Sequence, residues 1–175
     1  MTAADGVLRL TLVRHGHAQA AEPGLADFDR PLDRKGETEA LEMARRCVDV
    51  GCVPDLILCS PALRTSQTAA TFARALQLSH DRLQLNAALY LADHTSLLGA
   101  IQQTPIHVSH LMLVSHNPGL SDLALQIAPG AGLDAFETGG LCTMSLSVSV
   151  WSGEGAGSAC EVRYDSPSRF FDFWS

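Results

Sequence analysis

The sequence contains no long apolar run and no excess of positive charge. No stretch approaches the ~20 apolar residues that a membrane-spanning helix needs, and the polar segment 1–6 lacks the charged-then-apolar plan of a signal peptide. Lys and Arg together number 12 and Asp and Glu 19, which gives a formal net charge of −7. General nucleic-acid binding needs a basic surface. We therefore expect a cytoplasmic protein that binds neither membranes nor nucleic acids.

The sequence also lacks motif-spaced cysteines, internal repeats and low-complexity segments. Its five cysteines are an odd number and their spacings match no zinc-binding or redox motif, so we expect reduced, mostly buried thiols. No segment has the composition of a linker between domains. Because 46% of the 175 residues are apolar, the chain can bury a sizeable core, and we expect a single domain over residues 1–175.

Short apolar runs alternate with segments of helical periodicity. Strands are predicted at 8–14, 55–59 and 110–115, more weakly at 82–86, and as a hairpin at 141–150 and 160–164 around a turn at 153–157. Helices are predicted at 36–50, 61–76, 93–103 and 117–128, the first with Leu41, Ala44 and Val48 at helical spacing. This alternation predicts an α/β fold of three layers, α/β/α, with a mostly parallel central sheet.

Two of the predicted helices share a start signal. Ser60-Pro61 and Asn117-Pro118 each pair a good N-cap residue with a proline, which is favoured at the first helical position. Asp93 is placed to cap the third helix. Ser60 and Asn117 are therefore interpreted first as helix caps, with any ligand contact as a secondary role.

The three strong strands each end in polar side chains. Arg14 and His15 end the first strand, Ser60 and Arg64 follow the second, and His116 follows the third. The carboxyl ends of parallel strands meet at one edge of a sheet, where helix N-termini favour anions. Arg64 lies in the first turn of its helix, where a cation opposes the helix dipole, and this misfit favours an anion-binding role. The sequence therefore predicts one pocket with two arginines and two histidines, suited to a phosphate.

Five segments around these residues carry a resemblance to a known family. They are Leu12–Gly16, Arg30–Leu32 with Lys35-Gly36, Ser60–Ala69, Val114–Leu120 and Phe136–Leu141. In their order and spacing they resemble the signature segments of the histidine phosphatase superfamily, over roughly residues 8–150. The absence of a large insert between residues 70 and 110 is similar to the small SixA-type phosphohistidine phosphatases. The resemblance implies a phosphoglycerate-mutase-like fold.

The resemblance also implies a reaction without metal or cofactor. His15 would be the nucleophile, Arg14 and Arg64 would clamp the phosphoryl oxygens, and His116 would stabilise the charge that builds up on them. The attacking nitrogen of His15 must be unprotonated, so its other ring nitrogen should donate to a backbone carbonyl. Further substrate contacts are expected from Gly16, Gln19 and Asn117, although Gln19 would serve equally well as a solvated side chain.

The general acid and the substrate are less well defined. Asp93 is a candidate general acid, and a plain helix cap is the alternative. A leaving imidazole can take its proton from solvent, so the lack of a clear acid favours a phosphorus–nitrogen substrate, such as a phosphohistidine protein or a small phosphoramidate. Sugar and nucleotide phosphates stay open. Near the expected entrance, Glu22, Asp27 and Asp29 would disfavour highly charged substrates.

Two other functions remain open. A metallohydrolase could be built on His15, His17 and His116, because His-x-His is a spacing that metal ligands use. A module that captures phosphate or phosphohistidine without turnover would use the same pocket. The aromatic end, 170–174, is expected either to pack on the core surface or to contact a partner.

Overall fold

Strands and helices alternate along most of the chain. The computed structural model describes residues 7–133, 136–147, 150–152 and 159–169, so the expected turn at 153–157 and the aromatic end lie outside the described residues. The strands are β1 Leu8–Arg14, β2 Leu56–Cys59, β3 Leu83–Leu85, β4 His110–Ser115, β5 Leu141–Leu146 and β6 Ala159–Asp165. The helices are α1 Arg34–Asp49, α2 Leu63–Ala75, α3 His94–Gln102 and α4 Gly119–Ile127, with short 3-10 turns η1 Asp27–Asp29, η2 His80–Arg82 and η3 Ala87–Leu89.

The strands form one mixed sheet in the order β3-β2-β4-β1-β5-β6. The first four strands in this order are parallel, whereas β5 is antiparallel to both β1 and β6, as the predicted hairpin requires. In the register, Arg14 of β1 lies beside Ser115 of β4, and Cys59 of β2 lies beside Val114. The carboxyl ends of these three adjacent strands are therefore level with one another at one edge of the sheet.

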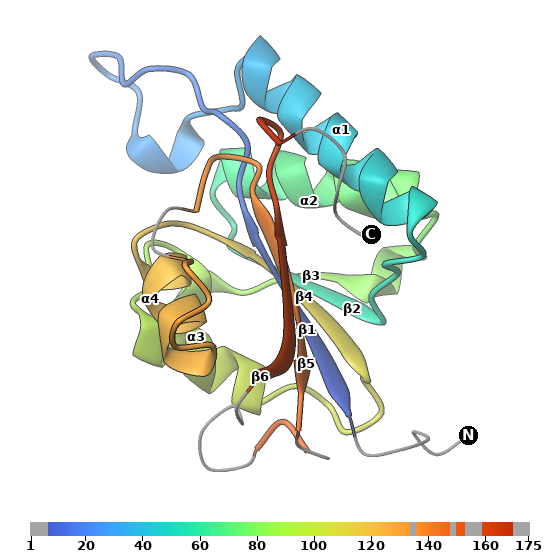
Figure 1. Cartoon of the computed structure of the whole chain (residues 1–175). Coiled ribbons are helices and arrows are strands. Elements are labelled where there is room, and N and C mark those ends of the chain that lie inside the picture. The colour runs from blue at the N-terminus through green and yellow to red at the C-terminus, as the bar shows by residue number, and fades with distance from the viewer. Residues whose placement is uncertain (1–6, 134–135, 148–149, 153–158, 170–175) are drawn as a thin grey trace.

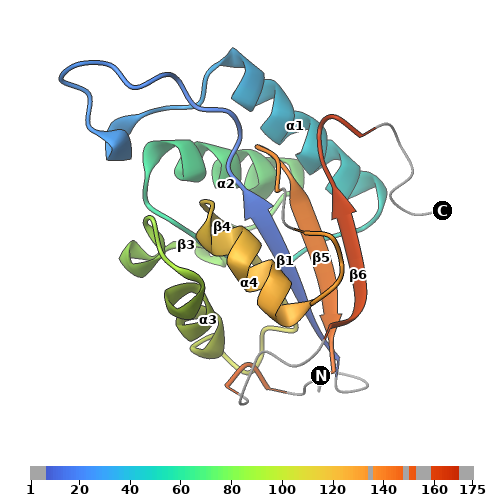
Figure 2. The ribbon, with the colours of Figure 1, turned by 60° about the vertical axis from the view of Figure 1, so that its left-hand side comes forward.

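Helices cover both faces of the sheet. Figures 1 and 2 show α1 and α2 on one face and α3 and α4 on the other. Two buried clusters correspond to these faces: Leu12 and Leu113 pack with α3 and α4, while Val13 and Val114 pack with α1 and α2. Neighbouring residues of one strand point to opposite faces, and both faces of the central strands are apolar because both are covered. The predicted α/β fold with three layers is confirmed.

The predicted apolar face of the first helix is only partly correct. The buried face of α1 contains Ala40, Met43, Ala44 and Cys47, whereas Leu41 and Val48 are 42% and 48% exposed. The buried face is displaced by one position from the predicted one, and Ala44 is common to both.

The predicted proline starts of two helices are wrong by one or two residues. Helix α2 begins at Leu63 with Ala62 at its N-cap, and α4 begins at Gly119 with Pro118 at its N-cap, and neither has a side-chain capping bond. The hydroxyl of Ser60 bonds with His116 instead, and the Asn117 amide donates to the Phe136 carbonyl. In both cases a partner from another part of the chain replaces the helix end.

The cysteines match their prediction. All five are free thiols, and four of them are buried, Cys160 being the exposed one. Within the described ranges, no helix is both long enough and apolar enough to cross a bilayer.

Gly36 sets how closely α1 approaches the segment after β1. A Cβ atom at Gly36 would overlap the carbonyl oxygen of His17, whereas a Cβ at Gly99, within α3, meets nothing within 4 Å. We expect Gly36→Ala to lower the free energy of unfolding by about 1–3 kcal/mol. Gly99→Ala, the matched control, should raise it by about 0.5–1 kcal/mol through helix propensity. Urea unfolding of both variants measures the difference, and a Gly36→Ala variant as stable as wild type would contradict this packing.

Candidate active site

His15 directly follows the last residue of β1, and the backbone of its neighbour fixes its ring. Its Nδ1 lies 2.8 Å from the carbonyl oxygen of Gly16. Because a carbonyl can only accept a hydrogen bond, Nδ1 carries the proton and Nε2 keeps its lone pair. This is the backbone bond that the sequence analysis expected. The Nε of Arg64 donates to that lone pair over 3.3 Å.

The surroundings of His15 keep its ring neutral. Burial lowers the pKa of His15 to about 4, and the nearby charges of Arg64, Arg14 and Arg30 act in the same direction, while the bond to Gly16 opposes them. The folded-state pKa therefore lies below the usual 6.5 of histidine. Between about pH 4 and pH 6.5 the ring keeps the neutral form that a nucleophile needs, although a solvated histidine would already be protonated there.

This difference can be observed by NMR. The ring signals of His15, assigned by their loss in His15→Gln, should stay unshifted as the pH is lowered from 7 to 5. An imidazole with an ordinary pKa would be mostly protonated at pH 5. A titration midpoint near pH 6.5 for His15 would contradict the buried, arginine-flanked environment described here.

Arg64 is the centre of the polar network. It is 4% exposed and lies in the first turn of α2. Besides His15, it donates to the carbonyl oxygen of Asp27, to Asp27 Oδ2 at 2.9 Å and to His116 Nδ1 at 3.4 Å. One planar group thus contacts both histidines and a carboxylate.

His116 follows β4 and is 2% exposed. Its ring centre lies 5.2 Å from that of His15, and its Nε2 lies 2.8 Å from the hydroxyl of Ser60. Burial, followed by the charges of His15 and Arg64, lowers the pKa of His116 to about 3, so that this ring is also neutral. Since Arg64 can only donate to Nδ1, the proton of His116 is on Nε2, from which it donates to Ser60.

Arg14 reaches the same region from the end of β1. It donates to the Phe136 carbonyl at 2.7 Å, and its buried Nε has no hydrogen-bond partner in the part of the chain that the structure describes. Burial lowers the pKa of Arg14, and the charge of Arg14 contributes to the lowered pKa of both histidines. Asn117 also donates to the Phe136 carbonyl, at 3.2 Å.

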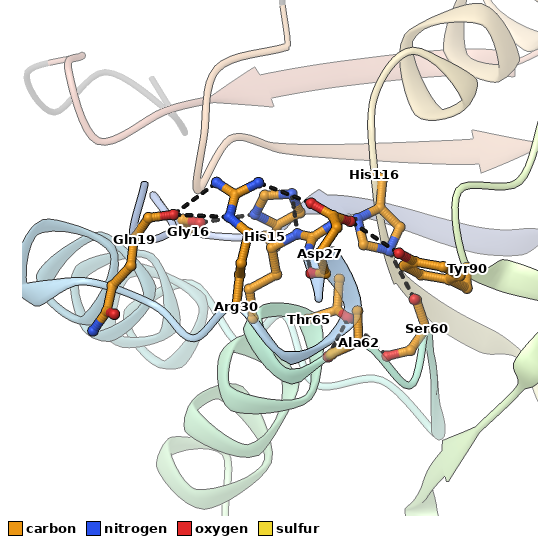
Figure 3. Close-up of polar contacts among 11 residues, drawn as sticks. His15, Gly16, Gln19, Asp27, Arg30, Ser60, Ala62, Thr65, Tyr90 and His116 are labelled. Carbon is orange, nitrogen blue, oxygen red and sulfur yellow. Dashed lines mark hydrogen bonds and ion pairs between the residues drawn. The ribbon is translucent and has the colours of Figure 1, made fainter. Parts of the chain in front are cut away.

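Gly16 and Gln19, which were also predicted to contact substrate, already make hydrogen bonds within the protein. The N–H of Gly16 donates to Thr68, and its carbonyl holds His15. The backbone carbonyl of Gln19 accepts two bonds from Arg30, and its side chain points away from His15 (Figure 3). Asp93 is the N-cap of α3, where its side chain accepts from the Ser96 N–H. This is the capping role that the sequence analysis gave as the alternative to a general acid.

His17 does not join the other two histidines. Its side chain is exposed, and its Nδ1 lies 2.6 Å from a carboxylate oxygen of Asp33. Among the residues that the structure describes, no three His, Cys, Asp or Glu side chains are grouped so that they could hold a metal ion.

Two further residues contribute to the site: Asp27, which the sequence analysis expected only near the entrance, and Tyr90, to which it gave no role. The Asp27 carboxylate lies on Arg64 and also accepts from the hydroxyl of Tyr90 at 2.9 Å (Figure 3). The ring of Tyr90 meets that of His116 edge to face at 5.7 Å. Both residues lie in loops, and their sequence neighbours give no pattern from which a loop conformation could be predicted.

Known proteins share this arrangement of segments. The family model of the histidine phosphatase superfamily, branch 1, matches residues 10–87. An uncharacterized protein of Mycobacterium tuberculosis is 31% identical over 166 residues, which cover 86% of this chain and 98% of the relative. An uncharacterized chloroplastic protein of Arabidopsis thaliana is 29% identical over 132 residues, 69% of this chain, and the chain spans 59% of that relative's length.

A solved structure extends the likeness to three dimensions. The SixA protein of Agrobacterium tumefaciens superposes with a TM-score of 0.72 at 33% identity, over 79% of this chain and 92% of that chain. The residues matched by the family model include His15 and Arg64. The chain therefore belongs to the histidine phosphatase superfamily, branch 1, and within it to the SixA-type proteins.

Proposed function

We propose that this protein is a metal-independent phosphatase that acts through a phosphohistidine formed on Nε2 of His15. The observation that carries the proposal is the state of one imidazole. Its Nδ1 proton is held by Gly16, so that the Nε2 lone pair faces the guanidinium of Arg64. A neutral nucleophile next to a phosphate-binding cation is what attack on a phosphoryl group requires.

In the first step, the Nε2 lone pair of His15 attacks phosphorus. The bond from phosphorus to the leaving atom breaks, and the leaving group departs with its electron pair. Arg64 and the unpartnered Nε of Arg14 supply donors for the phosphoryl oxygens. In the second step, water attacks phosphorus, and the phosphorus–nitrogen bond breaks, which releases phosphate and restores His15.

His116 and Ser60 together would stabilise the transition state. A serine hydroxyl both donates and accepts. When a phosphoryl oxygen replaces Arg64 at Nδ1 of His116, Ser60 can donate to Nε2 and the ring proton can move to Nδ1. The neutral ring then donates to the oxygen on which charge builds up. Preorganised donors of this kind contribute about 10²–10³ in rate each.

A phosphohistidine, on a protein or in a small molecule, is the substrate class favoured here. SixA proteins are phosphohistidine phosphatases by name, and the chain is 33% identical to one of them. The leaving imidazole of such a substrate can be protonated by solvent, which suits a site where Asp93, the candidate acid, caps a helix. Phosphoramidate is the smallest compound with the same phosphorus–nitrogen bond.

A substrate panel tests the proposal. Phosphoramidate, a phosphohistidine peptide and p-nitrophenyl phosphate are assayed side by side for phosphate release, with and without EDTA. We expect turnover that EDTA leaves unchanged and that is fastest for the phosphorus–nitrogen compounds. Activity that EDTA abolishes and a metal restores would support the metallohydrolase instead. Tight phosphate binding with no turnover of any compound would indicate the binding module.

A further inference from the structure

Asp27 lies beside the groups proposed to react, although its carboxylate was expected only near the entrance. Its Oδ2 accepts from Arg64 and from the Tyr90 hydroxyl, each at 2.9 Å, and its Oδ1 accepts from Arg30 at 2.8 Å. Figure 3 shows the carboxylate between Arg30 on one side and Tyr90 with His116 on the other. The Arg64 guanidinium that binds this carboxylate is the same group that contacts Nε2 of His15.

The contacts give Asp27 three independent supports. When Arg64 binds a phosphoryl group, it must give up at least one of its hydrogen bonds to Asp27, because the carboxylate and the phosphoryl group compete for the same N–H donors. Arg30 and Tyr90 remain, and they come from different segments of the chain. The carboxylate therefore stays beside the phosphoryl group after Arg64 has exchanged it. Its side chain is 43% exposed, so water from solvent reaches it.

We propose that Asp27 is a further catalytic residue, the carboxylate that accepts a proton from the water that hydrolyses phospho-His15. This inference rests on the proposed function and adds the proton acceptor that the reaction needs. A carboxylate held within hydrogen-bond reach of the attacking water is the usual form of such a base.

The step balances as follows. The water oxygen forms a bond to phosphorus, and the bond between phosphorus and Nε2 breaks, with its electron pair returning to Nε2 as the lone pair. One water proton moves to a carboxylate oxygen of Asp27. The remaining hydroxyl leaves on phosphorus as part of inorganic phosphate, and Asp27 then loses its proton to solvent.

The protonation state of Asp27 agrees with this role. Partial burial raises the pKa of its carboxyl, but hydrogen bonds from Tyr90, Arg64 and Arg30 outweigh that effect and lower the pKa to about 2. At neutral pH the group is ionised, so it is prepared to accept a proton and not to donate one. An enzyme with this carboxylate favours substrates whose leaving atom needs no proton from the protein, as in phosphohistidine, over alkyl phosphates.

The test compares Asp27→Asn with Asp29→Asn. Asparagine at position 27 keeps an oxygen that accepts from Arg64 and Tyr90 but cannot take a proton. The control, Asp29→Asn, removes the same charge two residues further along the same exposed turn. Rapid-quench experiments with phosphoramidate follow formation and loss of the phosphoenzyme by intact mass. For Asp27→Asn we expect formation within a fewfold of wild type, hydrolysis slowed about 10²-fold, and accumulation of the phosphoenzyme. Asp29→Asn should behave as wild type.

The affinity for inorganic phosphate separates catalysis from positioning. Asp27→Asn removes a negative charge that competes with phosphate for Arg64. Inorganic phosphate should therefore inhibit the variant as strongly as wild type, or more strongly. Weaker inhibition together with slower phosphoenzyme formation would mean that Asp27 only positions Arg64, and would overturn the inference. Phosphoenzyme hydrolysis at the wild-type rate would overturn it as well.

Two further results complete the test. Tyr90→Phe removes one support of the carboxylate, and we expect it to slow the same hydrolysis step by a smaller factor. Should Asp27→Asn fail to fold, the rate of that step in Tyr90→Phe decides, and an unchanged rate would count against Asp27. Failure of the proposed function itself looks different, because wild type would then acquire no phosphoryl group on His15, whether or not it turned over a substrate.

Discussion

Replacing His15 with alanine should abolish phosphate release from every substrate that wild type turns over. The variant keeps both arginines but has no lone pair in line with phosphorus, so the covalent step has no nucleophile. Loss of a nucleophile commonly lowers kcat by about 10⁴-fold or more. The measurement is phosphate release from phosphoramidate at saturating concentration, at pH 7 and in the presence of EDTA.

His17→Ala is the matched control for His15→Ala. His17 is two residues away, is exposed and lies against Asp33, so its loss should change turnover by less than about threefold. The two variants together also decide between covalent and metal-based catalysis, since a metal site on His15, His17 and His116 would need both. Substantial turnover by His15→Ala would exclude the nucleophile proposed here.

Arg64→Lys should lower kcat/KM by about 10²–10³ although it preserves the positive charge. The planar guanidinium contacts His15 through Nε, the Asp27 carbonyl through Nη1, and both the Asp27 carboxylate and His116 through Nη2. A lysine ammonium is a single point of charge and cannot bind two phosphoryl oxygens in the same plane. Loss of a well-placed donor to a developing oxyanion costs this much in other enzymes.

Arg74→Lys provides the comparison on the same helix. Arg74 is exposed in the last turn of α2, at the opposite end from Arg64. Its replacement should leave both kcat/KM and the free energy of unfolding in urea unchanged. If Arg64→Lys stayed within threefold of wild type, the guanidinium would not be the phosphoryl clamp.

The sequence predicted the convergence of the site because that depends on the strands. The apolar runs that end at Arg14, Cys59 and Ser115 are easily recognised, and parallel strands in adjacent positions must end at one edge. The Nδ1 bond of His15 followed from the nucleophilic role that the resemblance implied, since a nucleophilic imidazole needs its other nitrogen protonated. The expected cytoplasmic location stays a prediction.

The errors share a physical cause. Ser60 and Asn117 have the composition of helix caps, but partners from distant segments, His116 and the Phe136 carbonyl, take their polar atoms. The local preference for a cap is worth about 1 kcal/mol, which a buried partner readily exceeds. Asp27 was expected near the entrance only as one of three acidic residues. Its position on Arg64 depends on the conformation of the loop before α1, which no local pattern encodes.

The electrostatics of the site form one consistent picture. Burial, reinforced by the charges of nearby arginines, keeps both imidazoles neutral, and hydrogen bonds from Tyr90, Arg64 and Arg30 keep Asp27 ionised. The free site thus holds a neutral His15, a neutral His116 and an ionised Asp27, which are the charges that the two proposed steps require. Each is set by burial and by charges from β1, α2 and the loop that follows β1.

Locating the phosphoryl group on the intermediate tests the central claim most directly. Wild type and Asp27→Asn are mixed with phosphoramidate, quenched at alkaline pH, and examined by ³¹P NMR and by mass spectrometry of peptides. We predict an acid-labile phosphoryl group on Nε2 of His15, in larger amount in Asp27→Asn. Rapid turnover with the label on another residue, on Nδ1 of His15, or on no residue of the protein would contradict the account.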